Sequence, residues 1–204
     1  MWDQIKTTMD NAPPCESRSF EALRFSTPLP VGDYFLPDDE AVEALKPIMR
    51  LATSGMLESR LEAARIFCDL SLHDTMQQHM CDSGCIKALV EDLMACDMCD
   101  LTRQHAVLAL ANLSEAQGCQ EAMIEAGILP TLLHYVKDGP YNTAEMRREA
   151  ARILANLSAR LAHSVVAAVG PRAMAIWLEK VDSFRDERLK LHAERAREAL
   201  RTVG

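Results

Sequence analysis

Long apolar runs are missing from this sequence. The longest ones, such as residues 164–170 (SVVAAVG), fall far short of the roughly 20 residues that a membrane helix needs. The first twenty residues also lack a basic start followed by an apolar core, and Asp3, Asp10 and Glu16 argue against a transit peptide. We therefore expect a cytoplasmic protein with no membrane-inserted helix.

Aromatic residues are scarce as well, at 5% of the chain, whereas alanine, leucine, glutamate and arginine recur throughout. The aromatic residues that favour strands are therefore few, and the recurring residues favour helices. With 49% hydrophobic and 25% charged residues the composition is that of a globular domain with a sizeable core. The composition predicts an all-α fold.

An extended basic face is a third absence. The net charge is −8, and residues 1–100 carry 18 acidic against 8 basic side chains, while residues 101–204 carry 12 against 14. Because neutralising a nucleic-acid backbone requires clustered lysine and arginine, nucleic acid is not expected as a partner. The more basic C-terminal half remains suited to an acidic protein partner.

Catalytic signatures are also absent: the chain contains no G-x-S-x-G, no P-loop and no G-x-G-x-x-G. Nucleophilic catalysis would further need a serine or cysteine with a histidine base in reach. Four of the six histidines, His105, His134, His163 and His192, fall within predicted helices, where a structural role is the commoner explanation. We expect a protein that is not an enzyme and has no cofactor and no small-molecule substrate.

What the chain does contain is an internal repeat. The string LANLS occurs at residues 110–114 and again at 154–158, and three units align when it is used as an anchor. Equivalent positions then hold the same residue at steps of 43 or 44: Arg60, Arg103 and Arg147; Leu70, Leu113 and Leu157; Gly84, Gly127 and Gly170. Each unit is predicted to hold a long helix that starts at the arginine, a short helix before the glycine and a third helix after it, with the glycine as a left-handed cap.

The repeat predicts the domain organisation. Five prolines in residues 1–37 leave no room for a long helix, so this segment is expected to be an extended arm. Residues 38–204 form the repeat domain, within which Pro47 predicts a kink or an early stop in the first helix. The predicted divisions are a partial unit at 38–55, repeats at 56–101, 102–145 and 146–187, and a partial unit at 188–204.

The seven cysteines form an odd number scattered through helical sequence, so free thiols in a reducing compartment are expected. One cluster has metal-ligand character and consists of His79, Cys81, Cys85, Cys96 and Cys99. Cys81 and Cys85 align with two isoleucines of the next repeat, which favours small buried apolar residues at both places. A zinc site and a redox-responsive Cys96/Cys99 pair remain as minor alternatives, and no metal is predicted.

The unit length, the string ALANLS in the long helix and the string IEAGILPTLL in the next two helices closely resemble the armadillo repeat. The resemblance covers about residues 41–200 and is strongest at 102–137. It implies a right-handed α-solenoid of about three repeats, in which each repeat contacts its neighbours. It also implies a concave surface, lined by the long helices, that binds an extended peptide.

The resemblance suggests which residues face that peptide. Asn112 and Asn156 resemble the asparagine with which such proteins hydrogen-bond a peptide backbone, and Asp69 and Ala199 take its place in the first and last units. Nuclear-import members carry a tryptophan one turn earlier, where this chain has Arg65, Leu108, Arg152 and Arg195, a pattern more like the catenin type. The predicted partner-binding residues are Arg65, Asp69, Leu108, Asn112, Arg148, Arg152, Asn156 and Arg195.

These residues suggest an interaction or scaffold module that binds an extended, acidic or mixed-charge protein segment. Arginines spaced by four residues on one helix can hold carboxylates, although they can equally pair with glutamates of the protein itself. A second hypothesis is a small structural subunit of a larger assembly, held by the arm at residues 1–37. That arm could instead fold back onto the protein's own concave surface.

Overall fold

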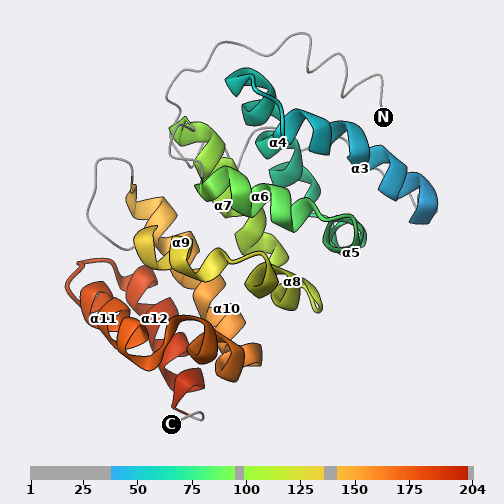
Figure 1. The fold of residues 1–204 in the computed structure, drawn as a ribbon. Helices are drawn as coiled ribbons and strands as arrows, with labels where there is room; N and C mark the ends of the chain where they lie inside the picture. The colour runs from blue at the N-terminus through green and yellow to red at the C-terminus, as the bar shows by residue number, and fades with distance from the viewer. Residues whose placement is uncertain (1–37, 95–98, 136–141, 202–204) are drawn as a thin grey trace.

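The computed structural model describes residues 38–94, 99–135 and 142–201, so the predicted arm at 1–37 lies outside the described residues. Helices account for the regular structure of these ranges, which contain no strand, and the all-α prediction is confirmed (Figure 1). In chain order the helices are α3 (Asp38–Ala52), α4 (Leu57–Leu70), α5 (Asp74–Asp82), α6 (Cys85–Met94), α7 (Asp100–Leu113), α8 (Cys119–Glu125), α9 (Ile128–Tyr135), α10 (Ala144–Val169), α11 (Pro171–Asp182) and α12 (Glu187–Leu200).

The long helices α4, α7, α10 and α12 form a continuous stack. Helix α4 packs against α7, α7 against α10, and α10 against α12, while α3 packs against α4 at the N-terminal end (Figure 1). The shorter helices α6, α9 and α11 each contact one or two members of this stack. The architecture is a helical solenoid with partial units at both ends.

The repeated leucines and glycines lie where the sequence predicts. Leu113 and Leu157 are fully buried and Leu70 is 6% exposed, so they form the apolar layer between long helices. Gly84, Gly127 and Gly170 have φ angles of +77°, +77° and +80°, a region that side chains with a Cβ rarely adopt. The positive φ predicted at these three glycines is therefore confirmed, but Gly170 has a ψ of 151° and so is not a left-handed helical cap.

The repeated arginines have a structural task that the sequence did not reveal. Each long helix begins three residues before its arginine rather than at it. Arg60 Nε donates to the carbonyl oxygen of Ser54 at 2.6 Å, and Arg147 Nη1 donates to that of Asn142 at 2.5 Å. Arg60 and Arg147 therefore tie the first turn of a long helix to the preceding loop, whereas Arg103 pairs with Asp100 in the first turn of its own helix.

Of the two alternatives predicted for Pro47, the early stop is wrong and the kink stays a prediction. Pro47 does not stop α3, which continues to Ala52; its ring is exposed, so water can reach the carbonyl group that loses its intrahelical donor. In the third unit the predicted long helix and the predicted short helix before Gly170 are both present, and they follow each other within α10 on either side of a kink at Leu161 (φ −128°, ψ 38°). Residues 159–163 contain no glycine or proline to separate the two helices.

None of the described helices is by itself long and apolar enough to cross a membrane. Helices α10 and α11 meet the length and composition criteria when taken together, with a bend of 113° between them.

Candidate functional site

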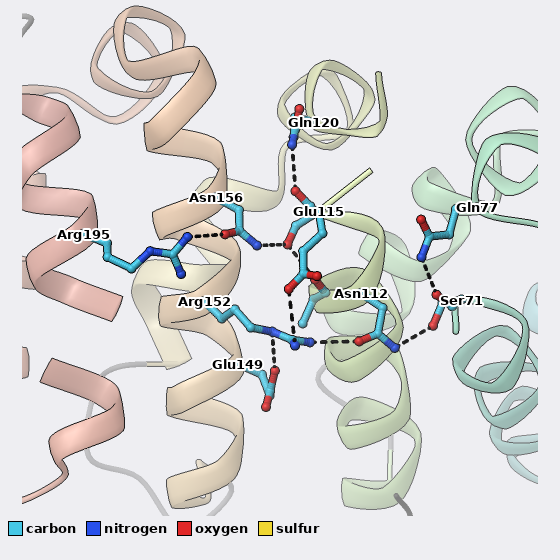
Figure 2. A network of polar contacts seen from close by, with 11 residues as sticks. Ser71, Gln77, Asn112, Glu115, Gln120, Glu149, Arg152, Asn156 and Arg195 are labelled. Atoms are coloured by element: carbon cyan, nitrogen blue, oxygen red, sulfur yellow. Dashed lines mark hydrogen bonds and ion pairs between the residues drawn. The ribbon is translucent and has the colours of Figure 1, made fainter. Parts of the chain in front are cut away.

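A chain of hydrogen bonds crosses the stack of long helices. Asn112 on α7 donates from Nδ2 to Ser71 Oγ, beyond the end of α4, at 3.0 Å, and its Oδ1 accepts from Arg152 Nη2 on α10 at 3.0 Å. One asparagine side chain therefore bonds to both neighbouring units at once (Figure 2).

The same pattern recurs one repeat later. Asn156 on α10 donates to Ser114 Oγ at 2.9 Å, and its Oδ1 accepts from Arg195 Nη2 on α12 at 3.2 Å (Figure 2). We call these two Ser–Asn–Arg sets the ladder: Ser71, Asn112 and Arg152, followed by Ser114, Asn156 and Arg195. We call the surface of α4, α7, α10 and α12 that carries them, together with Asp69 and Leu108, the ladder face.

The serines of the ladder are fixed by their own helices. Ser71 Oγ donates to the carbonyl oxygen of Cys68 at 2.7 Å, and Ser114 Oγ donates to that of Ala111 at 2.6 Å. Their backbone carbonyl oxygens accept from Gln77 and Gln120, in both cases at 2.8 Å. With its proton committed to the helix end, each hydroxyl presents a lone pair to the asparagine of the next helix.

The third serine of the series, Ser158, has no such partner. It is 1% exposed, and among the described residues nothing hydrogen-bonds to its Oγ. The position equivalent to the ladder asparagines in the last helix is Ala199, which has no side-chain amide to donate. The ladder therefore ends at α12.

The arginines of the ladder face differ in how their charge is compensated. Arg152 pairs with Glu149 at 2.8 Å (Nε to Oε2) and with Glu115 at 3.6 Å (Nη1 to Oε1). Arg195 makes no ion pair with the described residues, and its hydrogen bond to Asn156 goes to a neutral oxygen. Of Arg152 and Arg195, therefore, only Arg195 has a guanidinium charge that no carboxylate of the described residues compensates.

Arg148, also predicted as a binding residue, holds α12 in place. Its Nε lies 2.6 Å from Oδ2 of Asp186, and its Nη1 lies 3.7 Å from Glu145. Asp186 caps α12 by accepting from the backbone N–H groups of Arg188 and Leu189. The partner of this arginine is therefore a carboxylate of the protein itself.

The first long helix departs from the ladder. Arg65 donates to both carboxylate oxygens of Glu62, at 2.6 and 3.1 Å, and its Nη1 lies 3.5 Å from Oδ2 of Asp69. Leu108, which stands where the ladder has an arginine, is 6% exposed and part of the core. No guanidinium from α7 therefore reaches Asp69.

Burial perturbs two titratable groups in this part of the stack. It raises the pKa of Asp69 to about 6, an effect that the charge of Arg65 opposes. It lowers the pKa of His105 to about 4, and the charge of Arg65 adds to that shift. His105 is 4% exposed, and its Nδ1 has no hydrogen-bond partner among the described residues.

Sequence reasoning missed the groups that hold the ladder together. Ser114 bonds to the carbonyl oxygen of Ala111 at its own helix end and also accepts from Asn156 on the next long helix. The roles of Ser114, Gln77 and Gln120 in holding the ladder together were not predicted, whereas the pairing of Arg152 with glutamates of the protein was one of the two alternatives predicted for the arginines. The signal available was the 43-residue step that relates Ser71 to Ser114 and Gln77 to Gln120.

The cysteine cluster shows no metal geometry in the described part of the chain, where no three His, Cys, Asp or Glu side chains converge. Cys85 is fully buried, as the repeat alignment predicts, and Cys81 packs partly exposed against the core. Cys96 lies outside the described residues, so the Cys96/Cys99 redox pair stays a prediction.

Comparison with known proteins places the fold. No protein-family model and no curated protein sequence matches the chain. A designed armadillo repeat protein, YIII(Dq)4CqI, has 25% sequence identity and a TM-score of 0.66, with 80% of this chain and 68% of that chain covered. Computationally designed armadillo repeat proteins for modular peptide recognition have 24% sequence identity and a TM-score of 0.65, with 79% of this chain and 67% of that chain covered. The designed armadillo repeat protein YIII(Dq.V1)4CPAF, in complex with the peptide (KR)4, has 22% sequence identity and a TM-score of 0.66, with 96% of this chain and 80% of that chain covered. The chain has an armadillo-like repeat fold.

The ladder predicts unequal effects at two equivalent serines. Ser114→Ala should lower the free energy of unfolding by about 1–3 kcal/mol, because the Asn156 amide loses its buried acceptor. Ser158→Ala should leave it unchanged or raise it, because that buried hydroxyl gives up no bond within the described chain. Urea denaturation of the two variants checks this, and equal losses at both serines would show that the ladder bond contributes nothing.

The two shifted groups predict opposite effects of pH on stability. Between pH 6.5 and 4 the unfolded chain protonates His105 while the folded chain does not, so this histidine contributes a loss of up to about 3 kcal/mol to the free energy of unfolding on acidification. His105→Gln should remove this loss.

Asp69 contributes stability that is present below pH 4 and is lost as pH rises through about 6. Asp69→Asn should therefore raise the free energy of unfolding by about 1–3 kcal/mol more at pH 7 than at pH 4. Denaturation series from pH 4 to 7 measure both, and a slope of the same sign for the two variants would contradict the assignments.

Proposed function

We propose that this protein is a non-enzymatic interaction module that binds an extended segment of a partner protein along the ladder face. The observation that carries this is the ladder itself, which aligns amide groups from successive repeats across one surface at the spacing of the stacked helices. A preformed, stiff surface of this kind suits a flexible partner, since the protein itself loses little conformational entropy on binding.

The ladder asparagines retain hydrogen-bonding capacity for a ligand. A side-chain amide has two N–H groups and two carbonyl lone pairs, and the bonds within the ladder use one of each. The remaining donor and acceptor match the N–H and C=O groups of one residue of an extended chain. Asn112 is half-buried and Asn156 is 9% exposed, so Asn112 is the more accessible of the two.

An acidic residue of the bound segment is expected at Arg195. Arg148 and Arg152 already have carboxylate partners within the protein, whereas Arg195 is exposed and unpaired among the described residues. The acidic character proposed for the partner therefore rests on this one arginine rather than on a row of them. An exposed guanidinium can take a carboxylate in a bidentate pair.

The designed armadillo repeat proteins support peptide binding as the general activity, since they are described as made for modular peptide recognition and one is in complex with the peptide (KR)4. We also propose a cytoplasmic location. The described cysteines Cys68, Cys81, Cys85, Cys99 and Cys119 are free thiols, which suits a reducing compartment.

A structural subunit of a larger assembly is the second candidate. Ile176 on α11 and Leu191 on α12, the last two helices in chain order, are 58% and 61% exposed. Solenoids normally cover their terminal repeats with polar surface, so apolar residues here suit an attached partner. Under this alternative the partner covers the end of the stack rather than the ladder face.

Peptide selection on the intact protein tests the proposal. A displayed library of random 14-residue peptides is selected against the full chain, and the affinities of the enriched peptides are measured by calorimetry. We expect Arg195→Glu to weaken binding at least tenfold, because it places a carboxylate where the ligand needs a cation. Arg172→Glu, which makes the same charge change on α11, is the matched control and should leave binding unchanged. Enriched peptides that are insensitive to Arg195→Glu but are lost with Leu191→Glu would favour the second candidate.

A further inference from the structure

The ladder has a defect at its N-terminal end. We call each asparagine of the ladder, together with the arginine of the next long helix, a rung. In the first rung Asp69 on α4 stands where the other rungs have an asparagine, and Leu108 on α7 stands where they have an arginine. Both replaced residues belong to the same rung. A carboxylate therefore stands on the ladder face without the cross-helix cation that completes the next two rungs.

The carboxylate of Asp69 is poorly compensated within its own helix. Its nearest cationic group is Arg65 Nη1 at 3.5 Å, longer than an ordinary charged hydrogen bond. That guanidinium is already held by both carboxylate oxygens of Glu62 at 2.6 and 3.1 Å. Two carboxylates thus share one cation, and the side chain of Asp69, although 13% exposed, has unused lone pairs.

The C-terminal end of the ladder carries the opposite charge. Arg195 bonds to the neutral Oδ1 of Asn156 at 3.2 Å, is exposed, and makes no ion pair with the described residues. Arg152, between the two ends, is compensated by Glu149 and Glu115. The two ends of the ladder face therefore differ in sign, with an excess carboxylate at Asp69 on α4 and an unpaired guanidinium at Arg195 on α12.

We infer that the ladder face selects its partner segment by charge order, with a lysine or arginine of the segment on Asp69 and an aspartate or glutamate on Arg195. The inference rests on the proposed function and adds to it the kind of segment that is bound. Three helix-to-helix steps of 8–10 Å separate α4 from α12, or roughly 24–30 Å. At about 3.3 Å per extended residue, the two charged residues of the segment lie about eight residues apart.

The middle of the ladder face sets what lies between them. Asn112, which is half-buried, offers its free N–H and lone pair to the segment's backbone. An acidic residue in the middle of the segment gains nothing there, because Arg152 is already paired with Glu149 and Glu115. The segment is thus extended and charged at two places with opposite sign.

Charge exchange in the full chain tests this inference. The displayed 14-residue library is selected against the wild type and against the double variant Asp69→Arg/Arg195→Glu, with circular dichroism melting to verify the fold. The wild type should enrich peptides with one order of basic and acidic residues about eight positions apart, and the double variant should enrich the reverse order. Each set should bind its own protein at least tenfold more tightly than the other protein.

If the double variant Asp69→Arg/Arg195→Glu does not fold, single variants that remove one charge each test the same inference. Asp69→Asn places the amide of the other rungs at this position and should abolish the preference for a basic residue while keeping the acidic one. Arg195→Gln should do the reverse. Arg172→Glu is again the control, and it should leave the enriched charge order unchanged.

The outcomes separate this inference from the proposed function. Enriched peptides that depend on Asn112 but show no charge order, or show the same order with the exchanged protein, would overturn the charge-order inference and leave the binding surface in place. Enriched peptides that are insensitive to every ladder-face substitution would overturn both. A synthetic peptide of residues 1–37 that displaces the selected peptides would make the protein's own arm the occupant and overturn the assignment to a partner.

Discussion

The stacking of one long helix against the next is the constraint on which the rest of this structure depends. Helix α7 is buried along nearly its whole length between α4 and α10, so hydrogen bonds to these helices replace bonds to water. The ladder of serine, asparagine and arginine supplies such bonds for Asn112 and Asn156, because each amide bonds to the unit before it and to the helix after it. Polar groups thereby tie neighbouring repeats together beside the apolar layer of leucine and alanine.

The same arrangement gives the surface its functional character. Bonds within the ladder hold the asparagine amides in one orientation and leave each with one donor and one acceptor to spare. In the middle of the stack the arginine charge is balanced by carboxylates of the protein, whereas the end positions, Asp69 and Arg195, lack a full partner. Specificity for a ligand is therefore expected at the two ends, and general affinity for an extended backbone is expected between them.

Much of the fold could be predicted from the sequence, because the repeat fixes where each element recurs. The glycines with positive φ and the buried leucines follow from their spacing alone. The candidate site could be predicted only in outline. That Asn112 bonds to Ser71, or Arg148 to Asp186 across 38 positions, depends on how the helices superpose in space, which sequence spacing does not give. The sequence suggested that the arginines form a row of sites for a ligand's carboxylates. Because of how the helices superpose, most of these arginines are instead paired with carboxylates of the protein itself.

The central claim is that the ladder couples neighbouring repeats, and a double-mutant cycle between Asn112 and Arg152 tests it most directly. The free energy of unfolding is measured for the wild type, Asn112→Ala, Arg152→Ala and the double variant at one pH and ionic strength. Because the two side chains share a hydrogen bond between helices, the account predicts a coupling free energy of about 0.5–3 kcal/mol. Losses that add without coupling, within the error of the measurement, would contradict it.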